Sequence, residues 1–392
     1  MAKSAYVYSG TDWVPLASEV TNLTAYQTKA LNQFAHRNLI INGAMQVAQR
    51  GTSVSSVTSG GYLTADRWNE GVTTQGTWTI SVENDAPTGS GFGKSLKWLC
   101  TTADASPAAG DNLQFFTTLE GQNLQSIKKG TASAQQLTLS FWVKSNVTGT
   151  YIAELYDADN NRQTSKSYTV SASGVWEYKT ITFAADTTGA FDNDNNLSLY
   201  AIFGLGAGSN FTSGTLQTTW ASATTANRFV GQTNLASATS NYWQVTGVQL
   251  EVGDTATPFE FKPFAQDLAE CKRYYRKSFP YATAPASSYT TTRQELQGAR
   301  HQVSDSLGFR SQTLFFDTEM RTAPTVTLFN GSTDSSTTVR LYSNAGATQD
   351  IGNQVYAIDN YSFYLARYDS VSIGSTGLSM MVFFNYTASS EL

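Results

Sequence analysis

Histidines, cysteines and acidic residues are the side chains from which this chain could build a catalytic or metal site. Its only two histidines are His36 and His301, and neither stands in a motif that supplies a nucleophile or a metal ligand. The sequence has no G-x-S-x-G elbow, no G-x-x-x-x-G-K-[ST] loop, and no C-x-x-C or H-E-x-x-H spacing. We therefore interpret both histidines as surface or interface residues.

Pairs of carboxylates could still cleave a glycosidic bond, because that reaction needs one acid on each side of the scissile linkage. Glu251 and Glu260 are the best-placed acidic residues for such a pair. How closely two carboxylates approach depends on the fold, so the sequence leaves polysaccharide cleavage open as the less favoured activity. We expect a protein that is not an enzyme.

Two acidic runs imitate the first half of a calcium-binding loop. Each places carboxylate or amide side chains at the first, third and fifth positions: Asp157, Asp159 and Asn161 in one run, and Asp192, Asp194 and Asn196 in the other. Neither has glycine at the sixth position, where Arg162 and Leu197 stand, and neither has Glu at the twelfth. Both are predicted to be hairpin turns, in which Asn and Asp tolerate a positive φ.

The composition limits the classes of partner. The 392 residues are 40% hydrophobic, 12% aromatic and only 14% charged, with a net charge of -5. Nucleic acid or an anionic membrane would attract a basic surface, so the acidic balance argues against both. Twenty Tyr, eight Trp and many uncharged polar residues match the chemistry of sugar binding, which uses ring stacking and hydrogen bonds.

Cysteine usage and the N-terminus indicate where the protein is made. Cys100 and Cys271 are far apart in the sequence, and we predict two buried free thiols rather than a disulfide. We see no long apolar run, and we expect no signal peptide because the first ten residues contain no apolar h-region. These features suit assembly in a reducing cytoplasm.

Short alternating runs predict antiparallel strands through the middle of the chain. In residues 137–144, 151–156 and 197–203, successive side chains alternate between two faces, and Gly, Asn and Asp separate the runs. Repeated short runs of period two are typical of an antiparallel β-sandwich. The tryptophans in strand-like runs are predicted to be core residues: Trp68, Trp142, Trp176 and Trp243.

Residues 241–277 predict a strand, a turn and a helix in succession. Trp243 and Val245 share one face, and the apolar phase shifts by one residue after Gly247, which predicts a β-bulge. Pro263 suits the start of a helix. We predict that helix near residues 264–277, with one apolar stripe formed by Phe264, Leu268, Cys271 and Tyr275.

The N-terminal residues 1–37 are interpreted as an attachment or trimerisation segment. Residues 5–16 predict a short hairpin, and a heptad spacing between residues 20 and 34 predicts a helix. That helix could pack on its own domain or join three subunits in a stalk, and the spacing favours neither. The candidate contact residues are Tyr6, Tyr8, Trp13, Val20, Leu23, Gln27 and Phe34.

The predicted fold is therefore mainly β. An antiparallel β-sandwich occupies residues 38–278, and a second, smaller β-sandwich occupies residues 279–392. The strand predicted at residues 378–386 is apolar on both faces, so it needs cover on both.

Several motifs in order resemble the carbohydrate-binding-module-like region of tailed-phage tail-fibre proteins. They are NLIING (38–43), QRGT (49–52), TADRW (64–68), LTLSFWVK (137–144), QLEVG (249–253), ATPFE (256–260) and CKRYY (271–275). MRTAPTV (320–326) resembles a run that often follows the same module. One departure is Lys262, where the family usually has Arg. The resemblance implies a jelly roll, and it implies that Glu251 and Glu260 belong to a structural motif.

The same resemblance implies a function. It suggests a homotrimeric tail fibre, located in the virion, that docks on tail or adaptor proteins through its N-terminus and binds host polysaccharide or lipopolysaccharide. The alternatives are a virion structural or decoration protein whose module serves assembly only, and a polysaccharide depolymerase. No cofactor is expected, although the resemblance leaves open a structural calcium near Asn42 and Gly43.

Loop aromatics are the candidate sugar platforms. Residues 204–240 form the longest loop-like tract, and a long ordered loop is more often functional than decorative. Trp220 in this tract and Tyr289 in the linker after the helix are two candidates. In a virion fibre the distal domain usually meets the host first, so loop aromatics of the C-terminal domain are candidates as well. The predicted glycan-binding residues are Trp220, Tyr289, Tyr342, Tyr356 and Tyr361.

Overall fold

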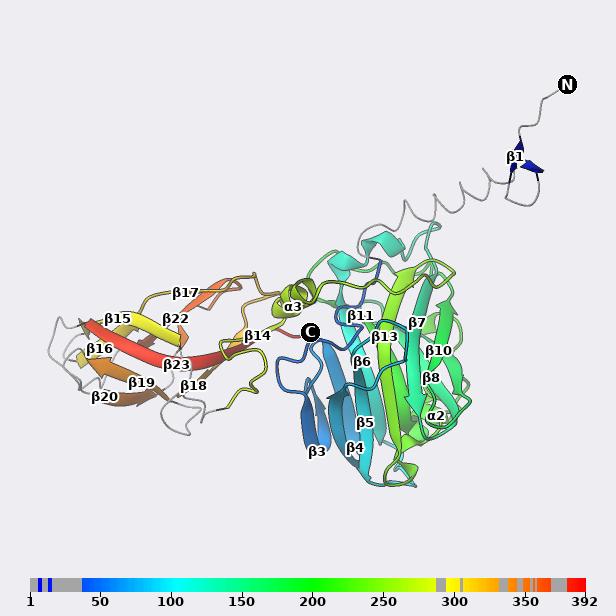
Figure 1. Ribbon diagram of the computed structural model, residues 1–392, viewed down its shortest axis with the longest axis horizontal. Coiled ribbons are helices and arrows are strands. Elements are labelled where there is room, and N and C mark those ends of the chain that lie inside the picture. The colour runs from blue at the N-terminus through cyan, green and yellow to red at the C-terminus, as the bar shows by residue number, and fades with distance from the viewer. Residues whose placement is uncertain are drawn as a thin grey trace.

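The computed structural model describes residues 6–8, 13–15, 37–286, 294–303, 306–330, 338–343, 348–352, 355–356, 358–367 and 379–392. Two β-rich bodies lie end to end, and α3 (Phe264–Lys272) lies where they meet (Figure 1). The prediction of a mainly β chain with antiparallel sheets is thus confirmed.

The larger body is a two-layer sandwich. Its strands are β3 (Ser53–Gly61), β4 (Trp68–Glu83), β5 (Ser95–Thr102), β6 (Asn112–Glu120), β7 (Leu137–Ser145), β8 (Gly149–Asp157), β9 (Arg162–Val170), β10 (Glu177–Phe183), β11 (Leu197–Ala207), β12 (Ala221–Ser222) and β13 (Tyr242–Val252). Short helices connect them: η1 (Gly121–Asn123), η2 (Gln125–Ile127), α2 (Ser209–Thr212), η3 (Thr225–Asn227) and η4 (Leu235–Ser237).

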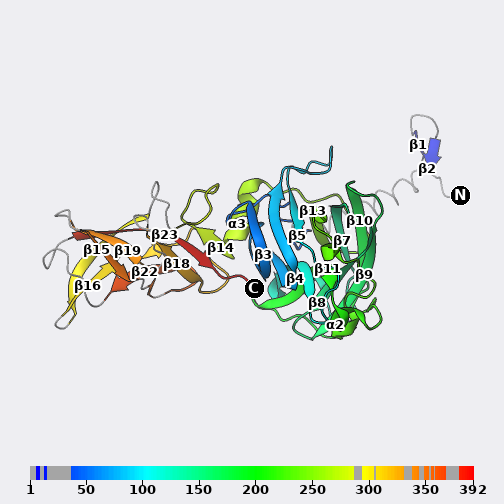
Figure 2. The same cartoon turned by 90° about the horizontal axis from the view of Figure 1, so that it is seen from below.

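One long strand joins the two layers. The first part of β4 pairs with β6 and its second part with β5, while Thr74 and Gly76 between them have positive φ angles of 54° and 72°. The hydrogen-bonded path therefore runs β10-β7-β13-β5-β4-β6-β11-β8-β9-β12 without a break. Figure 2 shows β13, β7 and β10 in one layer, with β11, β8 and β9 in the other.

The core between the layers is aromatic. Trp68 stacks on Phe115 with ring centroids 4.6 Å apart, and Phe203 and Trp243 pack beside them. Trp68 and Trp243 are fully buried, as predicted.

Trp142 and Trp176 are not core residues, so that part of the prediction was wrong. Trp142 directly follows the buried Phe141 on β7, so its side chain points to the opposite, outer face of the strand. There it packs against Tyr178 of β10. Trp176 precedes β10 and donates from Nε1 to Asp85 on the surface. Both are only half-buried.

The strand and helix predicted near residue 250 form, with one change. The register of β13 shifts between Thr246 and Gln249, and Gly247 has φ 62°, which confirms the bulge. The helix α3 ends at Lys272, earlier than predicted, because Tyr275–Lys277 forms β14 and pairs with a distant strand, β23. The predicted apolar stripe is also wrong in part, since Phe264 is exposed.

The smaller body is a second set of antiparallel strands with its own core. Besides β14, its strands are β15 (Gln294–Val303), β16 (Ser306–Ser311), β17 (Leu314–Phe315), β18 (Thr325–Phe329), β19 (Thr338–Ser343), β20 (Thr348–Gly352), β21 (Val355–Tyr356), β22 (Ser362–Arg367) and β23 (Ser379–Ser389). Phe363, Val382 and Phe384 are fully buried among its apolar residues.

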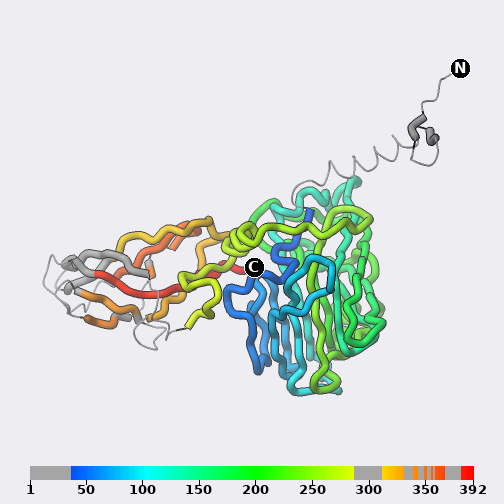
Figure 3. The backbone as a smooth tube through the Cα atoms, viewed as in Figure 1, coloured from blue at the N-terminus to red at the C-terminus, as the bar shows by residue number. Residues whose placement is uncertain are grey.

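The chain's last residues return to the larger body, as the red end of the tube in Figure 3 shows. Arg321 donates to Ser390 O at 2.8 Å and to Asn195 O at 3.0 Å. Arg50 of the larger body donates to Glu391 Oε1 at 3.0 Å. Polar contacts therefore fix how the two bodies meet.

The described residues answer three smaller predictions. Cys100 and Cys271 are free and buried, as predicted. The hairpin near the N-terminus forms from β1 (Tyr6–Tyr8) and β2 (Trp13–Pro15), whereas the helix predicted after it lies outside the described residues. Within the described part of the chain, no helix is long and apolar enough to cross a bilayer.

Candidate binding groove

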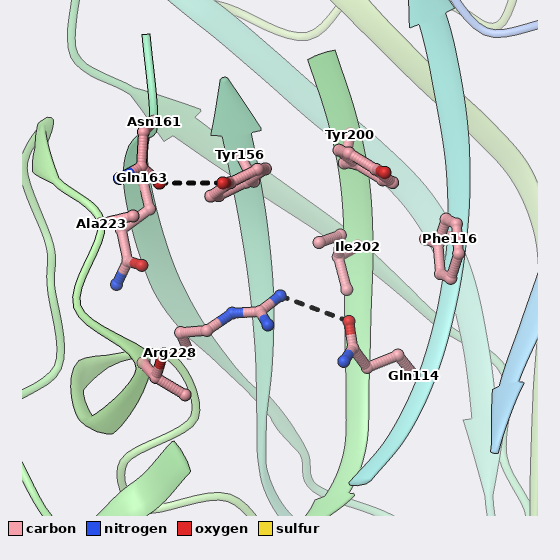
Figure 4. Close-up of a pocket in the computed structure, with 10 residues that line it drawn as sticks. Gln114, Phe116, Tyr156, Asn161, Gln163, Tyr200, Ile202, Ala223 and Arg228 are labelled. Carbon is pink, nitrogen blue, oxygen red and sulfur yellow. Dashed lines mark hydrogen bonds between the residues drawn. The ribbon is translucent and has the colours of Figure 1, made fainter. Parts of the chain in front are cut away.

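An open groove of about 530 Å³ crosses the outer face of the layer β6-β11-β8-β9 (Figure 4). Its lining comes from three strands of that layer, from the β8-β9 turn and β9, and from the tract after α2. The lining residues are Gln114, Phe116, Tyr156, Asn161, Gln163, Tyr200, Ile202, Ala223, Thr225 and Arg228. We call this the groove.

Three aromatic rings form the floor of the groove. Phe116 of β6, Tyr200 of β11 and Tyr156 of β8 stand on adjacent strands, with centroids 5.5 and 5.7 Å apart along the row. The residue next to each of them on its strand belongs to the core. Because successive side chains of a strand point to opposite faces, the three rings point outward. The rings are half-buried and keep accessible surface.

The two tyrosine hydroxyls differ in their environment. The Tyr156 hydroxyl donates to Asn161 Oδ1 at 2.9 Å, which fixes both side chains (Figure 4). The Tyr200 hydroxyl makes no hydrogen bond to the described residues. Burial, and then the neighbouring Tyr62 and Tyr156, raise the pKa of Tyr200, so it stays protonated as a donor.

One end of the groove carries amides. Asn161 closes the β8-β9 turn with φ 49°, as expected for Asn at such a turn, and its carbonyl accepts from Ala223 N at 2.9 Å. The Gln163 side chain exchanges two hydrogen bonds with the backbone of Thr224, at 3.2 and 3.3 Å. These contacts hold the wall of the groove against β9.

The wall is anchored by Phe229, which is fully buried on the outer face of the layer against Ile152 and Ile202. A Cβ atom on Gly204 of β11 would lie 2.7 Å from the Phe229 ring, so only glycine leaves room for it. Phe229 also supports its neighbour Arg228, whose guanidinium carbon lies over the ring.

Arg228 is held by a buried carboxylate. Its Nε lies 3.0 Å from both oxygens of Glu154, and its Nη2 lies 2.8 Å from Oε2. Nη2 also donates to Gln114 Oε1 at 3.3 Å (Figure 4). Glu154 is 1% exposed. Burial raises the pKa of its carboxyl, and the Arg228 guanidinium opposes that rise.

The lining can bind by stacking and hydrogen bonds. It offers aromatic rings, amides, a threonine hydroxyl and one guanidinium, and none of the ten lining residues is Asp, Glu, His or Cys. In the described part of the chain, no three His, Cys, Asp or Glu side chains gather as a metal site would require.

The acidic residues singled out in the sequence have structural contacts. Glu251 accepts from Thr257 N at 2.8 Å, and Glu260 accepts from Asn38 N at 2.8 Å. Asp157 pairs with the buried Lys129 at 2.5 Å. The Asn42 amide nitrogen, in the segment where a calcium was left open, donates to Val47 O and Asp66 O.

Three predicted glycan-binding residues have described side chains, Trp220, Tyr342 and Tyr361, and the structure does not bring these three together. Trp220 is half-buried, donates from Nε1 to Ala184 O at 2.9 Å, and is not part of the groove lining. Tyr342 packs against Phe383 with centroids 4.7 Å apart. Tyr361 of the smaller body is 51% exposed and stacks on Phe315, which is 68% exposed. Their role in binding stays a prediction.

The other predicted contact residues lie outside what the structure describes. Tyr289 is outside the described residues, and for Tyr356 only the backbone is described. Tyr6, Tyr8 and Trp13 are described by their strand pairing alone. The remaining candidates are all outside the described residues: Val20, Leu23, Gln27 and Phe34.

Sequence reasoning missed the groove residues themselves. Tyr156, Tyr200 and Ile202 lie in the runs that were predicted to alternate between two faces, but nothing local shows that these strands become neighbours. Arg228 had no signal beyond its place in the long loop tract.

Comparison with known proteins adds little. No family model and no curated protein matches the chain. Among solved structures, it is similar to the enzymatically active domain of tailspike protein 4 from Bacteriophage CBA120, at 13% identity and a TM-score of 0.30, covering 55% of this chain and 22% of that one.

Two further solved structures come from Clostridium thermocellum. One is the family 11 carbohydrate-binding module in complex with a β-1,3-1,4-mixed-linked tetrasaccharide: 12% identity, TM-score 0.26, 53% of this chain and 99% of that one. The other contains the CBM22-1-GH10 modules of xylanase 10B complexed with xylohexaose. Its sequence identity is 10% and its TM-score is 0.28, and the match covers 55% of this chain and 29% of that one. Scores this low support no inference about function. The fold and groove define the class instead, a two-layer antiparallel β-sandwich with an aromatic groove on one outer face.

Proposed function

We propose that the groove binds a glycan and that the chain is a non-enzymatic structural protein of a tailed-phage virion. In this proposal it is a homotrimeric tail fibre, which docks on tail or adaptor proteins through residues 1–37 and meets host polysaccharide or lipopolysaccharide. The row Phe116, Tyr200 and Tyr156 carries the glycan part of the proposal. The ordered motifs between residues 38 and 277 carry the virion part.

The chemistry of the groove favours a sugar over other small ligands. Sugar rings have apolar faces that stack on aromatic side chains, and hydroxyl groups that exchange hydrogen bonds with amides. The groove provides three rings in a row with Gln114 at one end and Asn161 and Gln163 at the other. The row of rings crosses the two strand spacings between β6 and β8, roughly 10 Å, so it is longer than a single sugar ring.

Titration of neutral oligosaccharides tests the proposal. We expect the substitutions Tyr156→Ala and Tyr200→Ala to weaken binding by about tenfold or more, because each removes a stacking surface. Tyr178→Ala is the matched control, since Tyr178 is a half-exposed tyrosine on the other layer. Equal affinities for all of these proteins would contradict the assignment of the groove.

The same samples separate this function from the alternatives. Shortening of host polysaccharide during incubation would instead indicate a depolymerase. An unchanged polysaccharide and no bound saccharide would favour a module that serves assembly only.

The virion role needs its own measurement. Native mass determination should give a trimer, and particles made with a chain that lacks residues 1–37 should have no fibres. A stable monomer would contradict the fibre proposal while leaving the groove assignment untouched.

A further inference from the structure

We propose that the groove selects uncharged saccharides, and that Glu154 sets this preference by neutralising Arg228. The inference rests on the proposed glycan-binding function and specifies the class of ligand. It follows from which atoms of Arg228 are already occupied.

Arg228 is the only charged residue in the groove lining, and the carboxylate of Glu154 neutralises its charge. Glu154 stands on β8 beneath it, contacts Nε and Nη2 at 2.8 to 3.0 Å, and is almost fully buried. The contacts are those of a charge-assisted pair, in which each oxygen of Glu154 accepts from the Arg228 guanidinium. The lining together with this pair therefore has no net charge.

The occupied edge of Arg228 is the one that would bind an acid. An arginine holds a carboxylate best through two parallel N–H bonds, and Glu154 already takes the Nε and Nη2 edge. Nη2 is also shared with Gln114 Oε1. The guanidinium carbon Cζ lies over the Phe229 ring, 4.9 Å from its centroid. Only Nη1 makes no hydrogen bond to the described residues.

A single free nitrogen suits a hydroxyl group better than a carboxylate. A ligand carboxylate at Nη1 would face the buried Glu154 charge across the same guanidinium, and two like charges share one cation only at a cost. A sugar hydroxyl accepts from Nη1 without that repulsion. The other polar lining groups, Gln114, Asn161, Gln163 and Thr225, are uncharged as well.

The test compares neutral oligosaccharides with uronic-acid oligosaccharides of equal length. We expect the wild-type protein to bind a neutral probe at least about tenfold more tightly than its carboxylated counterpart. Addition of sodium chloride should leave the neutral affinity unchanged, because no net charge is involved. A wild-type preference for uronic-acid probes would overturn the inference.

Substitution of Glu154 should change the selectivity. Glu154→Gln frees the charge of Arg228, so the ratio of neutral to carboxylated affinity should fall by about tenfold. The double variant Glu154→Gln with Arg228→Gln removes both charges and should restore the preference. Glu177→Gln on β10 is the control, because it removes one negative charge from the other layer.

The outcomes distinguish the two proposals. If neither class of probe binds the wild-type protein, glycan binding at the groove fails, and the selectivity fails with it. If neutral probes bind but Glu154→Gln leaves the ratio unchanged, only the role of Glu154 fails. Should that variant not fold, the wild-type ratio and its salt dependence decide.

Discussion

Arg67 of the larger body forms an ion pair with Glu391, although 324 positions separate them in the sequence. Arg67 is 1% exposed, and its guanidinium carbon lies 3.5 Å from the centroid of the Tyr274 ring. Arg50 also contacts Glu391, at 3.0 Å, from the other side. A buried cation and a residue just beyond the end of β23 (Ser379–Ser389) thus join the two bodies.

Glu391→Gln should destabilise the protein strongly. It leaves Arg67 buried without its charged partner, and loss of one member of a buried pair costs about 3–5 kcal/mol. Denaturant unfolding measures the loss. Glu319→Gln, an exposed site in the smaller body, is the control and should change stability by about 0.5 kcal/mol or less. Similar losses for the two variants would show that the junction contributes little.

Lys129 should be essential to the fold of the larger body. Its side chain is 2% exposed, and its ammonium contacts Asp157 at 2.5 Å, Asp186 at 3.1 Å and Gly189 O at 2.7 Å. Lys129→Met leaves Asp157 buried without a cation, so we expect a loss of about 3–5 kcal/mol. The exposed neighbour Lys128 offers the control Lys128→Met. Thermal unfolding of both variants makes the comparison, and equal melting temperatures would refute the expectation.

Gly204→Ala should disturb the groove from beneath. The added methyl group would lie 2.7 Å from the Phe229 ring and 3.0 Å from Gln232 Oε1, and such overpacking costs about 1–3 kcal/mol. We also expect weaker saccharide binding, because Phe229 supports Arg228. Gly93→Ala is the control, since nothing lies within 4 Å of its added carbon. Unchanged stability of Gly204→Ala would mean that Phe229 moves at no cost.

Glu70 should make stability fall as pH rises. Burial raises the pKa of the Glu70 carboxyl from 4.5 to about 8, although Leu63 N and Thr64 Oγ1 donate to it. Between pH 4.5 and about 8, the folded protein therefore keeps a proton that the unfolded chain has released. The contribution of this group to stability is complete below pH 4.5 and falls by about 1.4 kcal/mol for each pH unit as the pH rises toward 8.

Glu70→Gln removes that proton and should flatten the pH dependence. We expect denaturant unfolding at pH 4.5 and pH 8 to show that the free energy of unfolding of the variant, relative to that of the wild type, is higher at pH 8 than at pH 4.5. Parallel curves for the two proteins would exclude Glu70 as the cause.

The aromatic pair of the smaller body allows a direct test of where sugar binds. Phe315 and Tyr361 are the exposed pair, and Tyr361 was a sequence-based candidate. If the groove carries the site, the double substitution to alanine should leave saccharide affinity unchanged, whereas Tyr200→Ala weakens it about tenfold. Loss of binding in the double variant alone would place the site on the smaller body.

Local features of the sequence determined the strands and their faces. Alternation in residues 151–156 and 197–203 already separated the core residues from Tyr156 and Tyr200, and Gly247 marked the bulge. These features depend on neighbours along the chain, because a strand's side chains alternate whatever it pairs with.

Only the tertiary structure decided which strands lie side by side. The groove needs β6, β11 and β8 as neighbours, and Arg228 needs Glu154, which is 74 positions away. The helix α3 stops at Lys272 because β23, from the far end of the chain, pairs with β14. The order of strands and the pairing of distant charges arise from packing across the whole fold, which no local pattern encodes.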